Sequence, residues 1–87
     1  MATVVLPRTL AELFPAAPLQ VAADGSTVGA VIDDLDATFP GMRHRLLDAG
    51  PVIRRHLLIF VDAEKAGLAT AVAPGSEVRI VPALSGG

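Results

Sequence analysis

The stretch that decides the fold is EVRIVPALSGG, residues 77–87, with which the sequence ends. Polar and apolar side chains alternate along residues 77–81, a pattern that predicts a β-strand with one face on a core. Pro82 has no N–H for a sheet ladder, so we expect it to end the pairing or to lie at a sheet edge. Residues 83–87 close on two glycines, and we expect them to form a flexible tail.

Upstream of this stretch, the clearest element is one amphipathic helix. Ser26 or Thr27 can cap its first turn by accepting a backbone N–H bond, and Pro40-Gly41 ends it. Its negative charges fall opposite the apolar face, and we interpret them as a solvated surface rather than a catalytic pair. The apolar residues are Val28, Val31, Ile32, Leu35 and Phe39, and the acidic ones are Asp33, Asp34 and Asp36.

Around this helix the sequence predicts several shorter elements. These are strands at residues 2–6, 19–23 and 56–62, a brief strand after a turn at 62–65, and a short helix at 42–47 before a loop at 48–51. The first two strands are close in sequence, so an antiparallel hairpin with a long loop is the simple pairing. This order of elements favours an α+β fold in which the helix covers one sheet face. A β-grasp arrangement fits, with the first and last strands adjacent and parallel, and we expect one domain at residues 1–82.

Length and composition limit the class of protein. The chain has 87 residues, 52% of them apolar, which is enough for one modest core. A net charge of −2 and only three aromatic side chains, all Phe, argue against nucleic-acid binding. Cysteine is absent, which excludes disulfides, thiol nucleophiles and Cys-based metal sites. Any sulfur that the protein handles is therefore carried on another group.

The sequence also indicates a location. Residues 1–8 lack the basic start and the long apolar run of a signal peptide. The longest uninterrupted apolar run, residues 57–61, is far shorter than the ~20 residues of a membrane span. We therefore expect a cytoplasmic protein without a membrane partner.

Strand alternation predicts an apolar patch on the sheet face that the helix leaves open. If the helix covers one face of residues 57–61, then Leu58, Phe60 and Val81 lie on the other face, where Val5 joins them. We interpret this patch as a partner-binding surface. Two alternatives would leave the patch without a function. Single exposed hydrophobic residues are ordinary on protein surfaces, or the strand register is shifted by one residue so that these side chains face the core.

Other polar residues carry weaker signals. His44 and His56 have no spacing suited to a metal site, and none is predicted. Arg54-Arg55-His56 is a small basic cluster that either steers an acidic partner or is the solvated start of a strand. No constellation of acid, base and nucleophile is present, so we expect the chain not to be an enzyme by itself.

The diglycine end has two interpretations, an accidental flexible terminus or a segment shaped for chemistry at Gly87. Glycines have no Cβ, so Gly86 and Gly87 can thread a narrow channel and leave the terminal carbonyl unhindered. The residues after Pro82 reach at most about 17 Å when extended, which is enough to enter a partner's active site. The residues that would supply this reach are Ala83, Leu84 and Ser85.

These features resemble the ubiquitin-like sulfur carriers, a family that includes the small subunit of molybdopterin synthase and the thiamine-biosynthesis carrier. The resemblance rests on the ending, residues 78–87, with Pro74-Gly75-Ser76-Glu77 before it. It extends to residues 67–72, 26–32 and 4–7, and so spans nearly the whole chain. Within the family, the chain most resembles the actinobacterial carriers of cysteine biosynthesis. The resemblance implies a ubiquitin-like β-grasp fold, with a mixed sheet covered on one face by one main helix.

The resemblance also implies a chemical role for Gly87. An ATP-dependent enzyme similar to those that activate ubiquitin adenylates its carboxylate, and a sulfur donor displaces AMP to leave a thiocarboxylate. The carrier itself binds no cofactor, because the ATP is used by the activating enzyme. The protein is then a co-substrate, and the residues implied in partner binding are Gly86, Ser85, Leu84, Ala83, Val81, Phe60 and Leu58.

The resemblance leaves open which reaction uses the activated carboxyl group of Gly87. In the cysteine branch, the thiocarboxylate adds to an aminoacrylate formed from O-phosphoserine on a PLP-dependent cysteine synthase, and a metalloprotease releases cysteine. In the molybdenum branch, the large subunit of molybdopterin synthase uses the same group. Pro82-Ala83 stands where molybdenum-type carriers often have Pro-Pro, which favours the cysteine branch, whereas residues 62–65 replace the usual Asn-Gly hairpin and do not assign a pathway. The remaining alternatives are a ubiquitin-like protein modifier and a plain interaction module.

Overall fold

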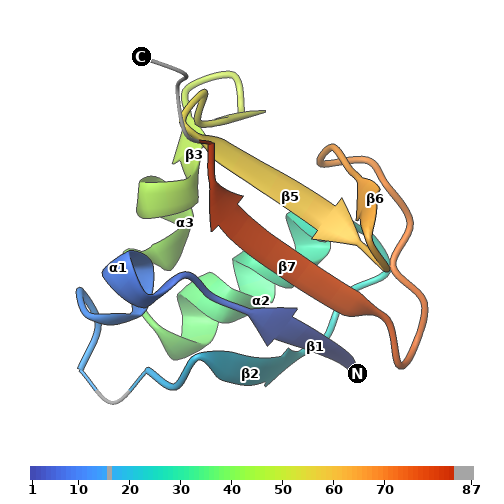
Figure 1. Cartoon of the computed structure of the whole chain (residues 1–87), viewed down its shortest axis with the longest axis horizontal. Helices are drawn as coiled ribbons and strands as arrows, with labels where there is room; N and C mark the ends of the chain where they lie inside the picture. Colours follow the sequence, from blue (N-terminus) through green and yellow to red (C-terminus); the bar gives the residue numbers. More distant parts are fainter. Residues whose placement is uncertain (16, 84–87) are drawn as a thin grey trace.

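The structure is a computed structural model, and it describes residues 1–15 and 17–83 (Figure 1). Its elements are β1 (Ala2–Val5), α1 (Arg8–Ala11), β2 (Gln20–Ala23), α2 (Val28–Thr38), α3 (Met42–Leu46), β3 (Leu47–Asp48), β4 (Val52–Ile53), β5 (Leu57–Val61), β6 (Glu64–Lys65) and β7 (Glu77–Pro82). Within the described residues, one sheet has five strands in the order β2-β1-β7-β5-β6, and β3 and β4 form a separate ribbon. The predicted α+β class is confirmed.

The first and last strands of the described chain, β1 and β7, are neighbours inside the sheet. β1 runs parallel to β7, with Val4 opposite Val78, and antiparallel to β2, with Val4 opposite Val21. β5 runs antiparallel to both β7 and β6. The sheet is therefore mixed, and its first and last strands are adjacent and parallel as the β-grasp prediction requires.

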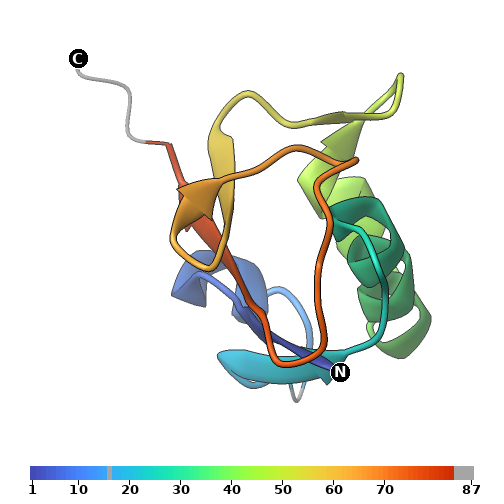
Figure 2. The same ribbon diagram turned by 90° about the vertical axis from the view of Figure 1, so that its right-hand side faces the viewer.

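Helix α2 covers one face of this sheet, as the side view in Figure 2 shows. Four residues of α2 and three facing strand residues are each at most 1% exposed: Val28, Val31, Ile32 and Leu35 on the helix, and Ile59, Val78 and Ile80 on the sheet. Complete burial of a side chain of this kind is worth roughly 1.5–3 kcal/mol, so the aliphatic core holds the helix on the sheet.

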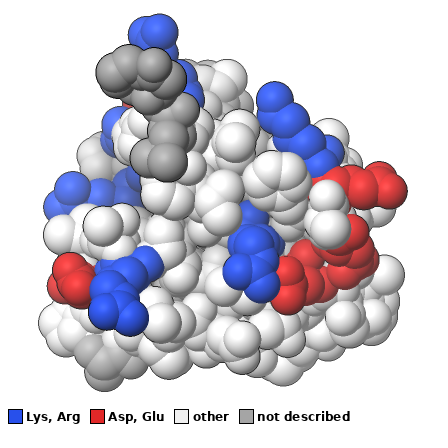
Figure 3. Space-filling model, viewed as in Figure 1, with Lys and Arg blue, Asp and Glu red and all other residues white. Residues whose placement is uncertain are grey.

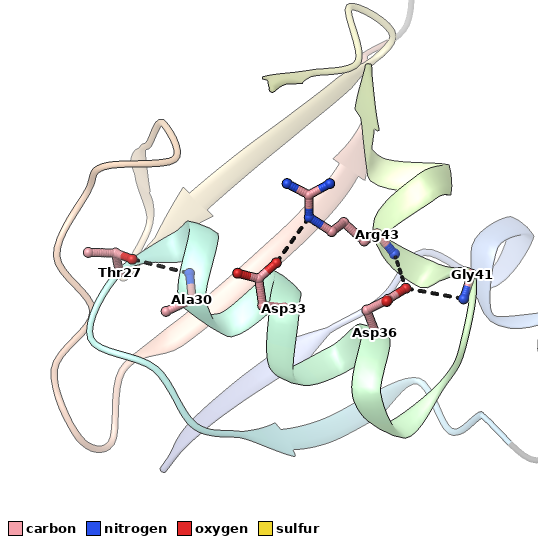
Figure 4. Close-up of polar contacts among 6 residues, drawn as sticks. All are labelled: Thr27, Ala30, Asp33, Asp36, Gly41 and Arg43. Atoms are coloured by element: carbon pink, nitrogen blue, oxygen red, sulfur yellow. Dashed lines mark hydrogen bonds and ion pairs between the residues drawn. The ribbon is translucent and has the colours of Figure 1, made fainter. Parts of the chain in front are cut away.

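The start of α2 is fixed by two kinds of hydrogen bond. Thr27, not Ser26, is the cap, because its Oγ1 accepts the N–H of Ala30 at 3.1 Å (Figure 4). The N–H groups of Val28 and Gly29 donate to carbonyl oxygens of the loop at residues 66–72, at 3.0 and 2.9 Å. This loop, which forms no helical turn, therefore supplies acceptors to the free donors of the first helical turn.

The acidic face of α2 is structural as well as solvated. Asp36 Oδ1 accepts the N–H groups of Gly41 and Arg43 at 3.1 and 3.0 Å, and Asp33 pairs with Arg43 Nε at 3.0 Å (Figure 4). Asp36 thus caps the following helix from outside it, in the way that an N-cap side chain satisfies free donors. These contacts join α3 to α2 and set the direction in which the chain returns to the sheet.

Two details of the prediction are wrong. The segment at residues 48–51 was expected to be only a loop, but Asp48 pairs with Val52 and Leu47 with Ile53 in a short antiparallel ribbon. Each strand of this ribbon is too short for alternation to be detected. Residues 10–14 suggest a short helical turn from their sequence, but the helix there, α1, lies earlier, at Arg8–Ala11. No helix in the described part of the chain is long and apolar enough to cross a membrane.

Candidate functional site

The sheet face opposite α2 carries the predicted apolar patch. Leu58 and Val81 lie directly opposite each other on β5 and β7, and Phe60 lies opposite Arg79. Val5 lies opposite Arg79 on the other side of β7. The register prediction is therefore confirmed, since these residues share one face while Ile59 and Ile80 turn into the core.

The patch is less exposed than the sequence suggested. Leu58, Phe60, Val81 and Val5 are all half-buried, because side chains on neighbouring strands of one sheet face cover each other's flanks. The patch therefore offers a closely packed apolar surface on rigid strands rather than isolated projecting side chains.

One member of this face, Arg79, was not recognised from the sequence. It lies between Val5 and Phe60 across the strands, and its Nε pairs with Glu77 Oε1 at 3.0 Å. The alternation of residues 77–81 was the signal that placed Arg79 on the open face. Its aliphatic stem adds apolar area there, while its guanidinium provides a cation at the edge of the patch.

The described chain is still hydrogen-bonded to the sheet at Ala83. Pro82 belongs to β7 and lies opposite Leu57, and the N–H of Ala83 donates to His56 O at 2.8 Å. Along an antiparallel strand, alternate N–H groups point to the same neighbour. Because the N–H of Ala83 points to β5, the nitrogen of Pro82 faces the other side, where pairing with β1 has already ended at Arg79. Pro82 is therefore the last residue of β7 and its nitrogen lies at an edge of the sheet, which agrees with the expectation that it ends the pairing or lies at an edge.

The remaining predicted site residues, Leu84, Ser85, Gly86 and Gly87, lie outside the described residues. The described chain stays on the sheet up to Ala83, which is half-buried. Val81, the last member of the patch, is thus followed by two more residues that the sheet still positions.

At the other end of β5 and β7, Asp62 ties a tight hairpin to the start of β7. Its carboxylate accepts the N–H of Glu77 at 2.9 Å and the hydroxyl of Ser76 at 2.8 Å. The bond from the Glu77 backbone, followed by the bond from Ser76, lowers the pKa of Asp62 below its ordinary value. This carboxylate stabilises the strand pair that carries the patch and lies at the opposite end of these strands from Ala83.

The structure brings together two residues that are far apart in the sequence. His44 and His56 line one cavity, beside Pro82. Within residues 1–15 and 17–83, no group of three or more His, Asp or Glu side chains is arranged to hold a metal ion.

Comparison with known proteins identifies the fold and its relatives. Residues 4–87 match the ThiS family. The chain belongs to that family. It is also 44% identical over 73 residues to the sulfur carrier protein CysO of Mycobacterium tuberculosis, an alignment that covers 77% of this chain and 78% of the relative. The small archaeal modifier protein 1 of Haloferax volcanii is 32% identical over 79 residues, with 90% of this chain and 91% of the relative covered.

Solved structures of relatives have the same ubiquitin-like β-grasp fold. The crystal structure of CysO from Mycobacterium tuberculosis superposes with a TM-score of 0.87 at 38% identity, and covers 97% of this chain and 100% of that chain. A chain of the crystal structure of the Amycolatopsis orientalis BexX/CysO complex superposes with a TM-score of 0.89 at 30% identity, with both chains fully covered. The predicted family and fold are therefore confirmed.

Proposed function

We propose that this protein is a sulfur carrier whose Gly87 carboxylate is converted into a thiocarboxylate. One observation carries the proposal: the match to the ThiS family extends to residue 87, so it includes both the central strand β7 and the diglycine ending. Relatives that are named sulfur carrier proteins support it at 44% identity. The absence of cysteine is consistent with this role, because the sulfur would be carried on an acyl group.

The activation that we propose has two steps, and both take place on a partner enzyme. An oxygen of the Gly87 carboxylate attacks the α-phosphorus of ATP, pyrophosphate leaves, and an acyl adenylate forms. A sulfide donor then attacks the carbonyl carbon, and AMP leaves with the bonding electron pair. One oxygen of Gly87 is thereby replaced by sulfur, and Gly86 leaves the reacting carbon accessible because it has no Cβ.

The open sheet face would bind the activating enzyme. Leu58, Phe60 and Val81 provide apolar area on rigid strands, and Val81 is close in sequence to the residues that must enter the active site. Because the sheet holds the chain up to Ala83, four residues remain to reach the reaction centre, about 14 Å when extended. The tail would thus be presented from a fixed point.

For the acceptor reaction we propose cysteine formation. The thiocarboxylate sulfur would add to the β-carbon of an aminoacrylate on a PLP-dependent synthase, which gives a thioester of cysteine. Transfer of the acyl group from sulfur to nitrogen, followed by hydrolysis of the new amide by a metalloprotease, would free cysteine and restore the Gly87 carboxylate. The 44% identity to CysO favours this branch over the molybdenum branch.

A tail-extension experiment tests the proposal. The chain, and a variant with one alanine added after Gly87, would each be incubated with an activating enzyme, ATP, sulfide, O-phosphoserine and the PLP-dependent synthase. We expect cysteine bound to the carrier only for the unextended chain, while circular dichroism and the melting temperature stay equal. Equal product from the extended variant would contradict the proposal.

A second candidate is a protein modifier, favoured by the 32% identity to the small archaeal modifier protein 1. In that case a lysine amine, rather than sulfide, would attack the activated carbonyl and form an isopeptide bond. Mass spectrometry of cellular proteins would separate the two functions. Because Arg79 is the last tryptic site of the chain, tryptic peptides that carry residues 80–87 on a lysine would support the modifier, and their absence alongside sulfur-loaded carrier would support the sulfur carrier.

A further inference from the structure

A cavity of about 400 Å³ lies beside the end of β7, between α1, α3 and the start of β5. Its apolar lining includes Leu10 from α1, Leu13 from the turn that follows α1, and Leu57 and Pro82 from the sheet. Leu13 is 51% exposed, which is unusual for a leucine next to other apolar side chains. The volume lies within the range of ~300–1,000 Å³ that is typical of ligand pockets.

The cavity and the apolar patch lie on opposite sides of the same two strands. Leu57 and Pro82 lie opposite each other, and the next pair along, Leu58 and Val81, belongs to the patch. Successive side chains of a strand point to opposite faces, so the first pair faces the cavity and the second faces the open side. The last residues of β7 are therefore flanked by binding surface on both sides, immediately before the tail.

The rim of the cavity is basic. His44, Arg45, Arg54 and His56 line it. Residues 43–56 contain four of the seven Lys and Arg residues of the chain and both histidines, with Asp48 as the only acidic residue among them. The whole chain has a net charge of −2, whereas the net charge of residues 43–56 is positive.

The charge is unevenly distributed over the surface as well. On the face in Figure 3, the largest group of acidic atoms lies on the right, over β6 and the start of β7, and no comparable acidic group lies at the upper left, where basic atoms lie over α3 and the start of β5; further basic groups lie at the upper right, the centre and the lower left. A field of this kind attracts anionic groups to the end of the sheet from which the tail leaves.

The basic side chains at the rim have different roles. Arg54 is held in place, because its Nη1 pairs with Asp48 Oδ1 at 2.9 Å and its Nη2 donates to His44 O at 2.7 Å. Arg45, in contrast, takes part in none of the ion pairs formed between described residues. Arg45 is therefore the cation at the rim whose charge is available to a partner.

We propose that this cavity docks an acidic segment of a partner protein, in which an apolar side chain is flanked by carboxylates. The apolar side chain would lie against Leu13 and Leu57, and a carboxylate would pair with Arg45. A partner that holds the tail already lies beside Pro82, so a second contact there is intramolecular and gains from a high effective concentration. This docking site is separate from the open-face patch; the gain in effective concentration rests on the tail binding proposed above, whereas the apolar and charge complementarity of the cavity does not.

Titration of the ¹⁵N-labelled chain with short synthetic peptides tests the proposal. The first peptide has Leu-Phe flanked by glutamates, the second has glutamines in their place, and the third has alanines in place of Leu-Phe. We expect the first to shift the amide signals of Leu13, Arg45 and Leu57 while Phe60 stays unchanged. The second and third peptides should bind at least roughly fivefold more weakly, because the second lacks the carboxylates that would pair with Arg45 and the third lacks the apolar side chains that would fill the cavity.

Two charge-reversal variants make the test specific. Arg45→Glu should weaken the first peptide by roughly three- to tenfold, because an attraction becomes a repulsion at the rim. Lys65→Glu makes the same change of net charge on β6, outside the cavity lining, and should alter the affinity by less than about twofold. Equal weakening by both variants, equal binding of all three peptides, shifts confined to the open face, or no binding of the first peptide would each overturn the proposal.

Discussion

Leu58 and Val81 lie directly opposite each other on neighbouring strands of the open sheet face, and Ala83, two residues after Val81, is still hydrogen-bonded to the sheet. Any protein that covers this pair is also beside the root of the tail. The same strands continue through the Leu57–Pro82 pair, which lines the basic cavity on the other side. The proposed recognition surfaces and the proposed reactive end would thus be coupled through the last residues of β7.

The first prediction concerns the patch. Leu58→Asp should lower kcat/KM of the activating enzyme for this carrier by about 30-fold, because a central apolar contact of an interface is typically worth about 2 kcal/mol. Leu58 is half-buried on the open face, so the fold should persist. Val52→Asp is the matched control, because Val52 is 52% exposed on β4, away from the patch. If the Leu58→Asp and Val52→Asp variants are activated equally well, the patch is not the docking surface.

A second prediction concerns the hairpin between β5 and β6. Asp62 and Ala63 have φ angles of 49° and 72°, in the left-handed region that costs an ordinary residue about 1 kcal/mol. Ala63→Gly should therefore raise the free energy of unfolding by about 1 kcal/mol, as measured by urea denaturation. The same change at Ala37, exposed on α2, should lower it by about 1 kcal/mol. Loss of stability in both variants would contradict the assigned turn.

The pH dependence of stability gives a third prediction. The folded-state pKa of Asp62 is lowered, chiefly by the Glu77 N–H and then by Ser76. A group with a lowered folded pKa stabilises the fold above its unfolded pKa, near 3.8, and loses that contribution as the pH falls through the folded pKa. Asp62→Asn should therefore be less stable than the parent chain at pH 7, and the difference should shrink below about pH 4. A difference that stays constant down to about pH 2 would show that the charge of Asp62 has no such role.

The sequence was informative where periodicity is long and regular. The face of α2, the register of β5 and β7, and the patch could all be predicted, because each depends on spacing within one segment. The β3–β4 ribbon could not, since its strands are two residues each. The acidic residues of α2 looked solvated because their partners, Arg43 and the turn at Gly41, become neighbours only when α3 folds back.

The cavity was beyond the reach of the sequence for a related reason. Leu13, Arg45 and Pro82 come from three separate segments, and no spacing connects them. Arg54-Arg55-His56 gave a partial signal as a basic cluster. The sequence does not show that this cluster lies next to the end of β7, because that position depends on the antiparallel pairing of Leu57 with Pro82.

The central claim is that Gly87 carries the sulfur, and intact-mass spectrometry tests it most directly. The chain would be incubated with the activating enzyme, ATP and sulfide, and the modified residue located by fragmentation. The account predicts that one oxygen is replaced by sulfur in the fragment that contains Gly87, and that the exchange does not occur when ATP is omitted. An unmodified Gly87 under complete conditions, or sulfur located on any other residue, would contradict the account.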